Sequence, residues 1–284
     1  MTQPQMISIV TPSYNQGQFI EEAITSVRSQ NYANWEHLVI DAQSTDNTLN
    51  ILRSLTEAGK RPNIAWISEP DNGQSEALNK GFRRAKGEII GWLNSDDRYR
   101  PGCFESIVRA FEDHPEIDII YGDYLMVDEG GNALALRREI EFSRFILLYH
   151  HVLYIPTTAT FFRRRIFDDN NWLDETLHYA MDLEFFIRLS SRGYRFKHLP
   201  RLLADFRLQA DSKTCRSADK QRMEHKQIAL ASMHVFGHTN LLVLKKTLLW
   251  LLWPIACILR YSEKLLRGYY WEKLPSTEGN VGGI

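Results

Sequence analysis

The sequence predicts an α/β fold, a mostly parallel sheet with helices on both faces, and two observations lead to it. Short apolar runs of strand length alternate along residues 6–121 with segments in which apolar residues recur at helical spacing. Such alternation is typical of parallel sheets that helices cover on both faces. Polar residues also follow successive strands, and in a parallel sheet these positions share one edge, where ligands bind.

The predicted elements follow one another in a regular order. The first strand spans 6–10, and the first helix carries apolar residues from Ile20 to Val27. Asp46 is expected to be the N-cap of the second helix. The elements after the first helix are a strand at 35–40, a helix at 48–55, a strand at 64–67, a helix at 77–85, a strand at 89–93, a helix at 104–111 and a strand at 117–121.

Length and composition are those of an ordinary globular protein: 284 residues, 44% hydrophobic and 24% charged. The net charge of −1, with acids and bases interspersed, argues against a nucleic-acid partner. Cys103, Cys215 and Cys257 lie outside any metal-ligand spacing, so free thiols in a reducing compartment are expected. No signal peptide precedes the first strand, which predicts a cytoplasmic protein.

Four polar segments follow the predicted strands: 11–15, Asp41, 71–74 and 94–97. Because they share one edge of the sheet, they are expected to converge on a single ligand. The sequence has neither a Gly-x-Gly-x-x-Gly motif after the first strand nor a Walker-type phosphate loop. Side chains and a metal are therefore expected to hold the ligand.

The segment Asn94-Ser95-Asp96-Asp97 is the most informative of the four. Two carboxylates at the end of a buried strand suit a hard divalent cation whose other ligands are substrate phosphates and water. Such a cation can neutralise the charge on a leaving diphosphate. The alternative is that Asp96 and Asp97 cap the helix that begins near Phe104, or are simply loop acids.

Several motifs together resemble those of family 2 glycosyltransferases. They are SIVTPSYN at 8–15, DAQSTDNT at 41–48, EPDNGQSEALNKG at 69–81 and NSDD at 94–97. They occur in order, and the resemblance extends over roughly residues 6–210. It implies the GT-A fold, an inverting reaction and a nucleotide-sugar donor, with Mg²⁺ or Mn²⁺ as cofactor.

The resemblance also implies roles for single residues. Pro12 and Tyr14 would line the base pocket, and Asp41 would accept a hydrogen bond from the imide of uracil, which favours UDP. Lys80 is a candidate to offer positive charge to the diphosphate. The complete donor-binding set is Thr11, Pro12, Tyr14, Asp41, Gln74, Lys80, Asn94, Ser95 and Asp96.

The metal motif departs from the commoner pattern of the family. Asn94 stands where many members have the first Asp of Asp-x-Asp, and it would contact the ribose. Asp96 is the expected metal ligand, and Asp97 is expected beside it as a second acid of the site or a contact to the sugar. Gln209 replaces a His of many relatives, while Lys213 and Arg216 are candidates to clamp the diphosphate or to form a solvated turn.

Asp182 corresponds to the catalytic acid of the family, which acts as general base. Its spacing to Phe185, Phe186 and Leu189 also places it on the apolar face of a helix, whereas Glu184 and Arg188 form an i,i+4 pair on the other face. A carboxylate facing inward needs a reason, because burying an unpaired charge is costly. The alternative is a first-turn acid that the helix dipole stabilises.

The composition changes towards the C-terminus. Residues 247–259 carry no charge, are too few to span a bilayer and contain Pro254. Two Trp residues and flanking bases suit a helix that lies in a membrane interface through 241–268, and packing on protein is the alternative. The predicted organisation is a GT-A domain over 1–215 with a donor half (1–122) and an acceptor half (123–215), a C-terminal helical segment over 216–272 and a disordered tail over 273–284.

These features predict an inverting, metal-dependent glycosyltransferase of polysaccharide or lipid-linked oligosaccharide assembly, peripheral on the inner face of the membrane. Its partners would be a nucleotide-sugar donor and a saccharide or lipid-linked saccharide acceptor. One alternative is a catalytically silent sugar-nucleotide-binding or scaffold protein, which the departures at Asn94 and Gln209 favour. Another is a nucleotidyltransferase, but residues 11–17 lack the Arg or Lys of its phosphate loop.

Overall fold

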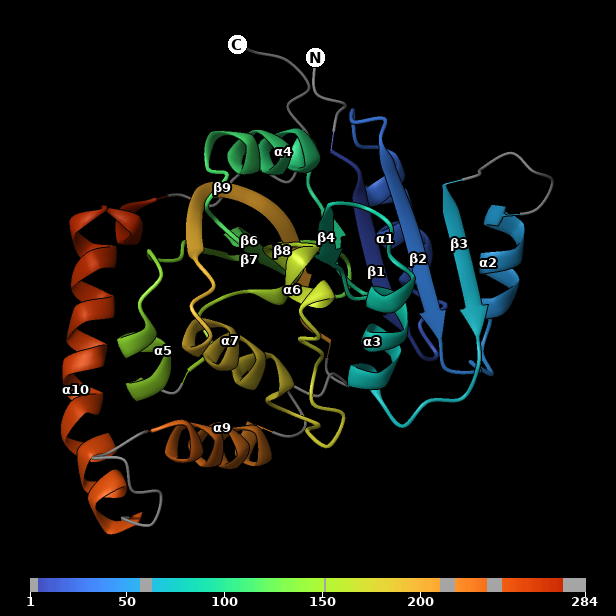
Figure 1. Ribbon diagram of the computed structural model, residues 1–284. Coiled ribbons are helices and arrows are strands. Elements are labelled where there is room, and N and C mark those ends of the chain that lie inside the picture. Colours follow the sequence, from blue (N-terminus) through green and yellow to red (C-terminus); the bar gives the residue numbers. More distant parts are fainter. Residues whose placement is uncertain (1–4, 57–62, 151, 210–217, 234–241, 273–284) are drawn as a thin grey trace.

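The computed structural model describes residues 5–56, 63–150, 152–209, 218–233 and 242–272 (Figure 1). The strands are β1 (Ile7–Ser13), β2 (Trp35–Asp41), β3 (Ile64–Ser68), β4 (Ile89–Trp92), β5 (Arg98–Tyr99), β6 (Ile119–Val127), β7 (Ala133–Arg137), β8 (Thr160–Arg163) and β9 (Phe196–Arg207). Within the described residues they form one sheet in the order β3-β2-β1-β4-β8-β6-β9-β5, with β7 paired to β6.

Helices alternate with the first strands and dominate the end of the chain. The α-helices are α1 (Ile20–Arg28), α2 (Thr48–Thr56), α3 (Gln74–Arg84), α4 (Cys103–Asp113), α5 (Arg144–Tyr149), α6 (Arg165–Asp168), α7 (Met181–Ser191), α9 (Ala218–Ser232) and α10 (Leu242–Leu266). Two short 3₁₀ turns, η2 (Thr157–Ala159) and η3 (Tyr269–Trp271), complete the described elements. Asp46 caps α2 as predicted, because its Oδ1 accepts a hydrogen bond from the Thr48 N–H at 2.9 Å.

The four strands of the N-terminal half are parallel, as the sequence predicts. β1 lies between β2 and β4, and β2 pairs with β3. Side chains of β1 alternate between two cores: Val10 packs with residues of α3 and α7, whereas Ile7 and Ile9 pack with residues of α1 and α4. Helices therefore cover both faces of the sheet, and every residue of β1 is buried.

The helix α3 lies very close to the sheet because Gly81 has no side chain. A Cβ at Gly81 would lie only 2.2 Å from Cγ1 of Val10 on β1. At the N-terminal end of the same helix, Gln74 forms a hydrogen bond with Asn94, the second residue after β4. The close packing thus brings the start of α3 to the edge of the sheet where β4 ends.

The second half of the sheet is mixed, which the sequence did not predict. β8 pairs antiparallel with β4 and β6, while β5 and β7 run antiparallel to β9 and β6. The strand predicted to end at Tyr121 continues as β6 to Val127 and pairs in parallel with β9. The parallel arrangement therefore holds for β3, β2, β1 and β4, and the strands beyond them join in both directions.

The C-terminal helices pack against the second half of the domain. α9 lies beside α7, and α10 runs along the outer side next to α5 (Figure 1). The buried Glu139 forms ion pairs with Arg260 and Lys264 of α10, each at 3.1 Å. One face of α10 is therefore packed on protein. Of the predicted domain limits, the division at 215/216 and the tail 273–284 lie outside the described residues.

Candidate active site

A cleft of about 990 Å³ lies at the carboxyl ends of the parallel strands. Its walls come from the loops after β1, β2, β3 and β4 and from the end of β9. The predicted convergence of polar loops at one edge is therefore confirmed. Six residues of the predicted donor-binding set line the cleft, namely Pro12, Tyr14, Gln74, Asn94, Ser95 and Asp96. Thr11, Asp41 and Lys80 are not part of its lining.

Hydrogen bonds fix the loop after β1 to the loop after β2. The backbone N–H of Asn15 donates to Oγ of Ser44, and Oδ1 of Asn15 accepts from the N–H of Thr45, both at 2.8 Å. Asn15 has a φ of 52°, a left-handed conformation that Asn adopts more readily than most residues. Tyr14 precedes it, lines the cleft and is 60% exposed, so its ring is available to pack against a planar group.

Asp41 ends β2, but its carboxylate is completely buried. Its Oδ2 accepts hydrogen bonds from the Ser44 N–H at 3.0 Å and the Ser68 hydroxyl at 2.7 Å, and its Oδ1 accepts from the Ser44 hydroxyl. Ala42 and Gln43, the next two residues, line the cleft instead. Asp41 therefore shapes the loop, and recognition of a base by Asp41 stays a prediction.

Thr11 and Lys80 are also engaged within the protein. The Thr11 hydroxyl forms a buried hydrogen bond with Nε2 of His37 at 2.9 Å, and burial lowers the pKa of His37 to about 3, which keeps this pair uncharged. Lys80 forms ion pairs with Glu76 at 2.9 Å and Glu69 at 3.4 Å. Its role towards a diphosphate stays a prediction that the cleft lining does not support.

Asn94 lines the cleft, and its side-chain amide bonds to Gln74, which also lines the cleft, and to Trp92 and Asp97 behind it. Oδ1 accepts hydrogen bonds from Nε2 of Gln74 and Nε1 of Trp92, both at 2.9 Å. Nδ2 donates to a carboxylate oxygen of Asp97 at 3.1 Å. An Asp at position 94 would face Asp97 with a second carboxylate and could not donate. The departure from Asp-x-Asp therefore has a local reason in hydrogen bonding.

The two predicted metal acids differ in where they lie. Asp97 is buried away from the cleft lining, and its carboxylate accepts hydrogen bonds from Oγ1 of Thr158 and the N–H of Arg207. Burial and the neighbouring Asp96 raise the pKa of Asp97 well above its usual range. Asp96 lines the cleft, and its Oδ2 accepts from Nε2 of Gln209 at 2.6 Å. Asp96 is thus the acid placed to meet a ligand, and a metal role for Asp97 stays a prediction.

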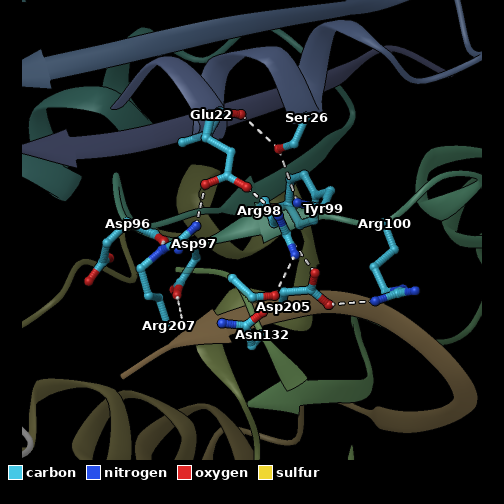
Figure 2. A network of polar contacts seen from close by, with 12 residues as sticks. Glu22, Ser26, Asp96, Asp97, Arg98, Tyr99, Arg100, Asn132, Asp205 and Arg207 are labelled. Atoms are coloured by element: carbon cyan, nitrogen blue, oxygen red, sulfur yellow. Dashed lines mark hydrogen bonds and ion pairs between the residues drawn. The ribbon is translucent and has the colours of Figure 1, made fainter. Parts of the chain in front are cut away.

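The guanidinium of Arg207 is a part of the site that sequence reasoning missed. Its Nε donates to the backbone oxygen of Asp96 at 2.9 Å, and it forms an ion pair with Glu22 of α1 (Figure 2). Glu22 also pairs with Arg98, which pairs in turn with the buried Asp205 at 2.6 Å. This network joins α1, β5 and β9 around the loop that carries Asp96. Glu22 had no sequence signal beyond that of a surface helix acid.

Asp182 lies in the first turn of α7 and is partly buried. Its Oδ1 accepts a hydrogen bond from the Leu183 N–H at 2.8 Å. Burial raises the pKa of Asp182 to about 6, although the hydrogen bond from Leu183 lowers it. The negative charge of Glu224 adds to the rise. Asp182 is not in the cleft lining, but the adjoining Met181 lines a smaller hollow that shares Gln74 with the cleft.

The rest of α7 agrees with its sequence pattern. Phe185, Phe186 and Leu189 are completely buried, as predicted for the apolar face. Glu184 and Arg188 form the predicted i,i+4 ion pair at 2.6 Å. Arg188 also donates to the backbone oxygen of Trp172 at 2.7 Å, so the pair ties α7 to the preceding loop.

The donor set around Asp96 fits a cation that takes most of its ligands from a substrate. No group of three His, Cys, Asp or Glu side chains suited to a metal occurs in the described part of the chain. One carboxylate on a cleft wall, held by the Gln209 amide, still suits Mg²⁺ or Mn²⁺ when a diphosphate and water complete the coordination. Lys213 and Arg216, the predicted diphosphate clamp, lie outside the described residues.

Comparisons with known proteins place the chain in a family. The family model described as glycosyl transferase family 2 matches residues 8–170. The chain is 28% identical over 225 residues to a chondroitin synthase of Pasteurella multocida, covering 78% of this chain and 22% of that protein. It is 26% identical over 278 residues to a chondroitin synthase of Escherichia coli, covering 95% of this chain and 37% of that protein. The chain thus spans well under half the length of these relatives.

Solved structures show the fold. S. aureus TarS 1–349 in complex with UDP-GlcNAc aligns with a TM-score of 0.63 at 17% identity, covering 95% of this chain and 76% of that chain. The mannosyltransferase PcManGT from Pyrobaculum calidifontis, in complex with GDP-Man and Mn²⁺, aligns with a TM-score of 0.61 at 17% identity, covering 96% and 78%. The predicted GT-A fold is therefore confirmed.

Proposed function

The chain belongs to glycosyl transferase family 2, and from that membership we propose that it transfers a sugar from a UDP-sugar to a hydroxyl group with inversion. The acceptor is a saccharide or lipid-linked saccharide of polysaccharide assembly, as the likeness to two polysaccharide synthases suggests. The observation that carries the proposal is the cleft itself. It brings an exposed aromatic ring at Tyr14 and a carboxylate at Asp96 to the same edge of the sheet.

The cleft offers a place for each part of a nucleotide sugar. The base would pack against Tyr14, within a pocket that the tied loops after β1 and β2 hold open. The diphosphate would lie near Asp96 and the N-terminal end of α3, which begins without a side-chain cap and whose dipole favours an anion. Asp96 would hold Mg²⁺ or Mn²⁺ there, and the bound cation would neutralise charge on the leaving diphosphate.

Asp182 would act as the general base of the transfer. The acceptor oxygen would attack the anomeric carbon opposite the diphosphate, forming the new glycosidic bond while the bond from carbon to phosphate oxygen breaks. The acceptor proton would pass to the Asp182 carboxylate, and UDP would leave with the bonding electrons. A base with a pKa of about 6 is ionised at neutral pH, yet accepts a proton more readily than an exposed Asp.

Thermal unfolding with nucleotides tests the donor site directly. We expect UDP with Mn²⁺ to raise the melting temperature, because a ligand that binds only the folded state stabilises it by about 2.7 kcal/mol at 100 times its Kd. GDP, CMP and dTDP with Mn²⁺ should stabilise less, and a chelator should remove most of the UDP effect. A larger shift with GDP would change the donor class. No shift with any nucleotide would favour the silent scaffold protein instead.

We also propose that α10 docks on a membrane surface with its outer face. By length and composition it is apolar enough to cross a membrane, but its ion pairs with Glu139 hold one face against the domain. Away from these contacts, the helix exposes Trp250 (76%) and Ile258 (66%) among other large apolar side chains. An amphipathic helix of this kind lies in the interface rather than across the bilayer.

Replacing Trp250 and Ile258 together by Ser should weaken binding to vesicles of phosphatidylglycerol and phosphatidylcholine by at least roughly 100-fold. The two side chains would lose about 1.5–3 kcal/mol of apolar burial each. Co-sedimentation with the vesicles measures the change. Leu134→Ser, which removes an exposed apolar side chain of β7 that is 48% accessible, serves as the matched control. Equal vesicle binding by the double variant and the control would contradict docking through α10.

A further inference from the structure

The segment that leads into α7 is held on one side by the donor half of the domain. Asn79 of α3 donates to the backbone oxygen of Leu173 at 3.0 Å and accepts from the Leu173 N–H at 2.9 Å. The hydroxyl of Ser75, the residue after the cleft-lining Gln74, contacts Sδ of Met181 at 2.7 Å. The start of α7 is therefore tied to the start of α3.

On its other side the same segment is held by α9. The backbone N–H of Tyr179 donates to Oε2 of Glu224 at 2.7 Å, and the backbone oxygen of Tyr179 accepts from Nε2 of Gln221 at 3.4 Å. Both polar backbone groups of Tyr179 are thus bound by side chains one turn apart on α9. Without these contacts, the N–H and the backbone oxygen of Tyr179 would need other hydrogen-bond partners.

The contacts of Tyr179 add to those of Ser75 and Asn79 at the entry into α7, which begins without a side-chain cap. The residue before the helix is Ala180, which has no side-chain group that could cap the first turn. Asp182 uses one of its own oxygens to accept from the N–H of Leu183. The position of the Asp182 carboxylate therefore depends on how the backbone at Tyr179, three residues earlier, is held.

We propose that Glu224 is a positioning residue for Asp182, acting through the backbone of Tyr179. Glu224 does not touch the cleft, and its carboxylate works by fixing the direction in which α7 begins. The helix α9 of the C-terminal segment then contributes to catalysis, because it helps to position Asp182. This inference rests on the proposed function, in which Asp182 takes a proton from the acceptor. The negative charge of Glu224 also favours the protonated form of Asp182, which agrees with such a role.

Two substitutions of Glu224 distinguish an effect of its hydrogen bond from an effect of how α9 packs. Glu224→Ala removes the acceptor for the Tyr179 N–H, whereas Glu224→Gln keeps an oxygen in its place. We expect Glu224→Ala to lower kcat by roughly 10- to 100-fold, since a small misplacement of a catalytic group costs about that much. KM for the nucleotide sugar and stabilisation by UDP should stay unchanged, and Glu224→Gln should restore most of kcat. Asp219→Ala, which removes an exposed acid of the same helix, should behave like the wild-type protein.

Turnover is measured as nucleotide released from UDP-GlcNAc and GDP-Man, and hydrogen exchange reports the Tyr179 amide independently of activity. Faster exchange at Tyr179 in Glu224→Ala, slowed again in Glu224→Gln, is the expected structural result. Unchanged kcat in Glu224→Ala, or an equal loss of UDP binding and kcat, would overturn the inference. If wild-type protein transfers sugar and Asp182→Asn does not, while Glu224→Ala keeps kcat, this inference fails alone. If wild-type protein neither binds nor turns over any nucleotide sugar, the proposed function fails first.

Discussion

Asp182→Asn is expected to lower sugar transfer by roughly 100- to 10,000-fold, the usual contribution of a general base, while UDP still binds. The Asn keeps an oxygen for the Leu183 N–H but cannot take the acceptor proton. Transfer and UDP-induced stabilisation are measured side by side. Glu184→Gln, a change in the neighbouring first-turn acid that pairs with Arg188, should keep most of the activity. Full turnover by Asp182→Asn would show that another group takes the proton.

Because the pKa of Asp182 is raised, both the activity and the stability of the protein are expected to depend on pH. The carboxyl of Asp182 binds its proton more tightly in the folded state, so its ionised form lowers the free energy of unfolding. This loss of stability grows with pH and reaches its full size above about pH 6. Wild-type kcat should therefore fall as pH drops below about 6, where the base becomes protonated. Asp182→Asn should raise the free energy of unfolding at pH 8, by up to about 3 kcal/mol, and the difference should shrink towards pH 4.

Asp96→Ala is expected to remove most of the metal-dependent part of nucleotide binding. Loss of this carboxylate takes away the proposed metal ligand on the cleft wall, so the affinity for UDP with Mn²⁺ should fall by at least about 10-fold. Affinity for UDP with chelator should change little. Isothermal titration of UDP, once with Mn²⁺ and once with chelator, measures the two affinities separately. Asp113→Ala, at the exposed end of α4, controls for the loss of an acid. Equal metal dependence in Asp96→Ala and wild-type protein would rule Asp96 out as the ligand.

The first half of the fold could be predicted from the sequence because two of its strands, β1 and β4, are buried at every residue. Strands that are buried on both faces appear as short, mainly apolar runs. β9 could not be found in this way, since its burial follows no regular period and it contains Pro200. β8 spans only Thr160–Arg163, which is too short to show a period. β8 and β9 therefore left no periodic signal in the sequence.

For the site, the sequence located the loops but not the direction of each side chain. Asp41 and Asp96 both follow a strand at the same edge, yet Asp41 is enclosed by Ser44 and Ser68 while Asp96 lines the cleft. A Ser three residues after an Asp is a local signal for such a closed turn, because the pair can bond within the loop. Arg207 and Glu22 meet across 185 positions of sequence, and no local pattern can reveal a contact of that kind.

The ion pairs of Glu139 join α10 to the unit of the protein that folds cooperatively. The side chain of Glu139 is only 3% accessible, and Arg260 and Lys264 supply its neutralising charges from the far end of α10. A chain cut before residue 242 would remove both counter-charges together with Leu249 and Ala256, which are buried in the core of the domain. A cut of that kind would therefore weaken the core of the transferase domain. α10 and the sheet that carries the cleft are thus expected to unfold in a single transition.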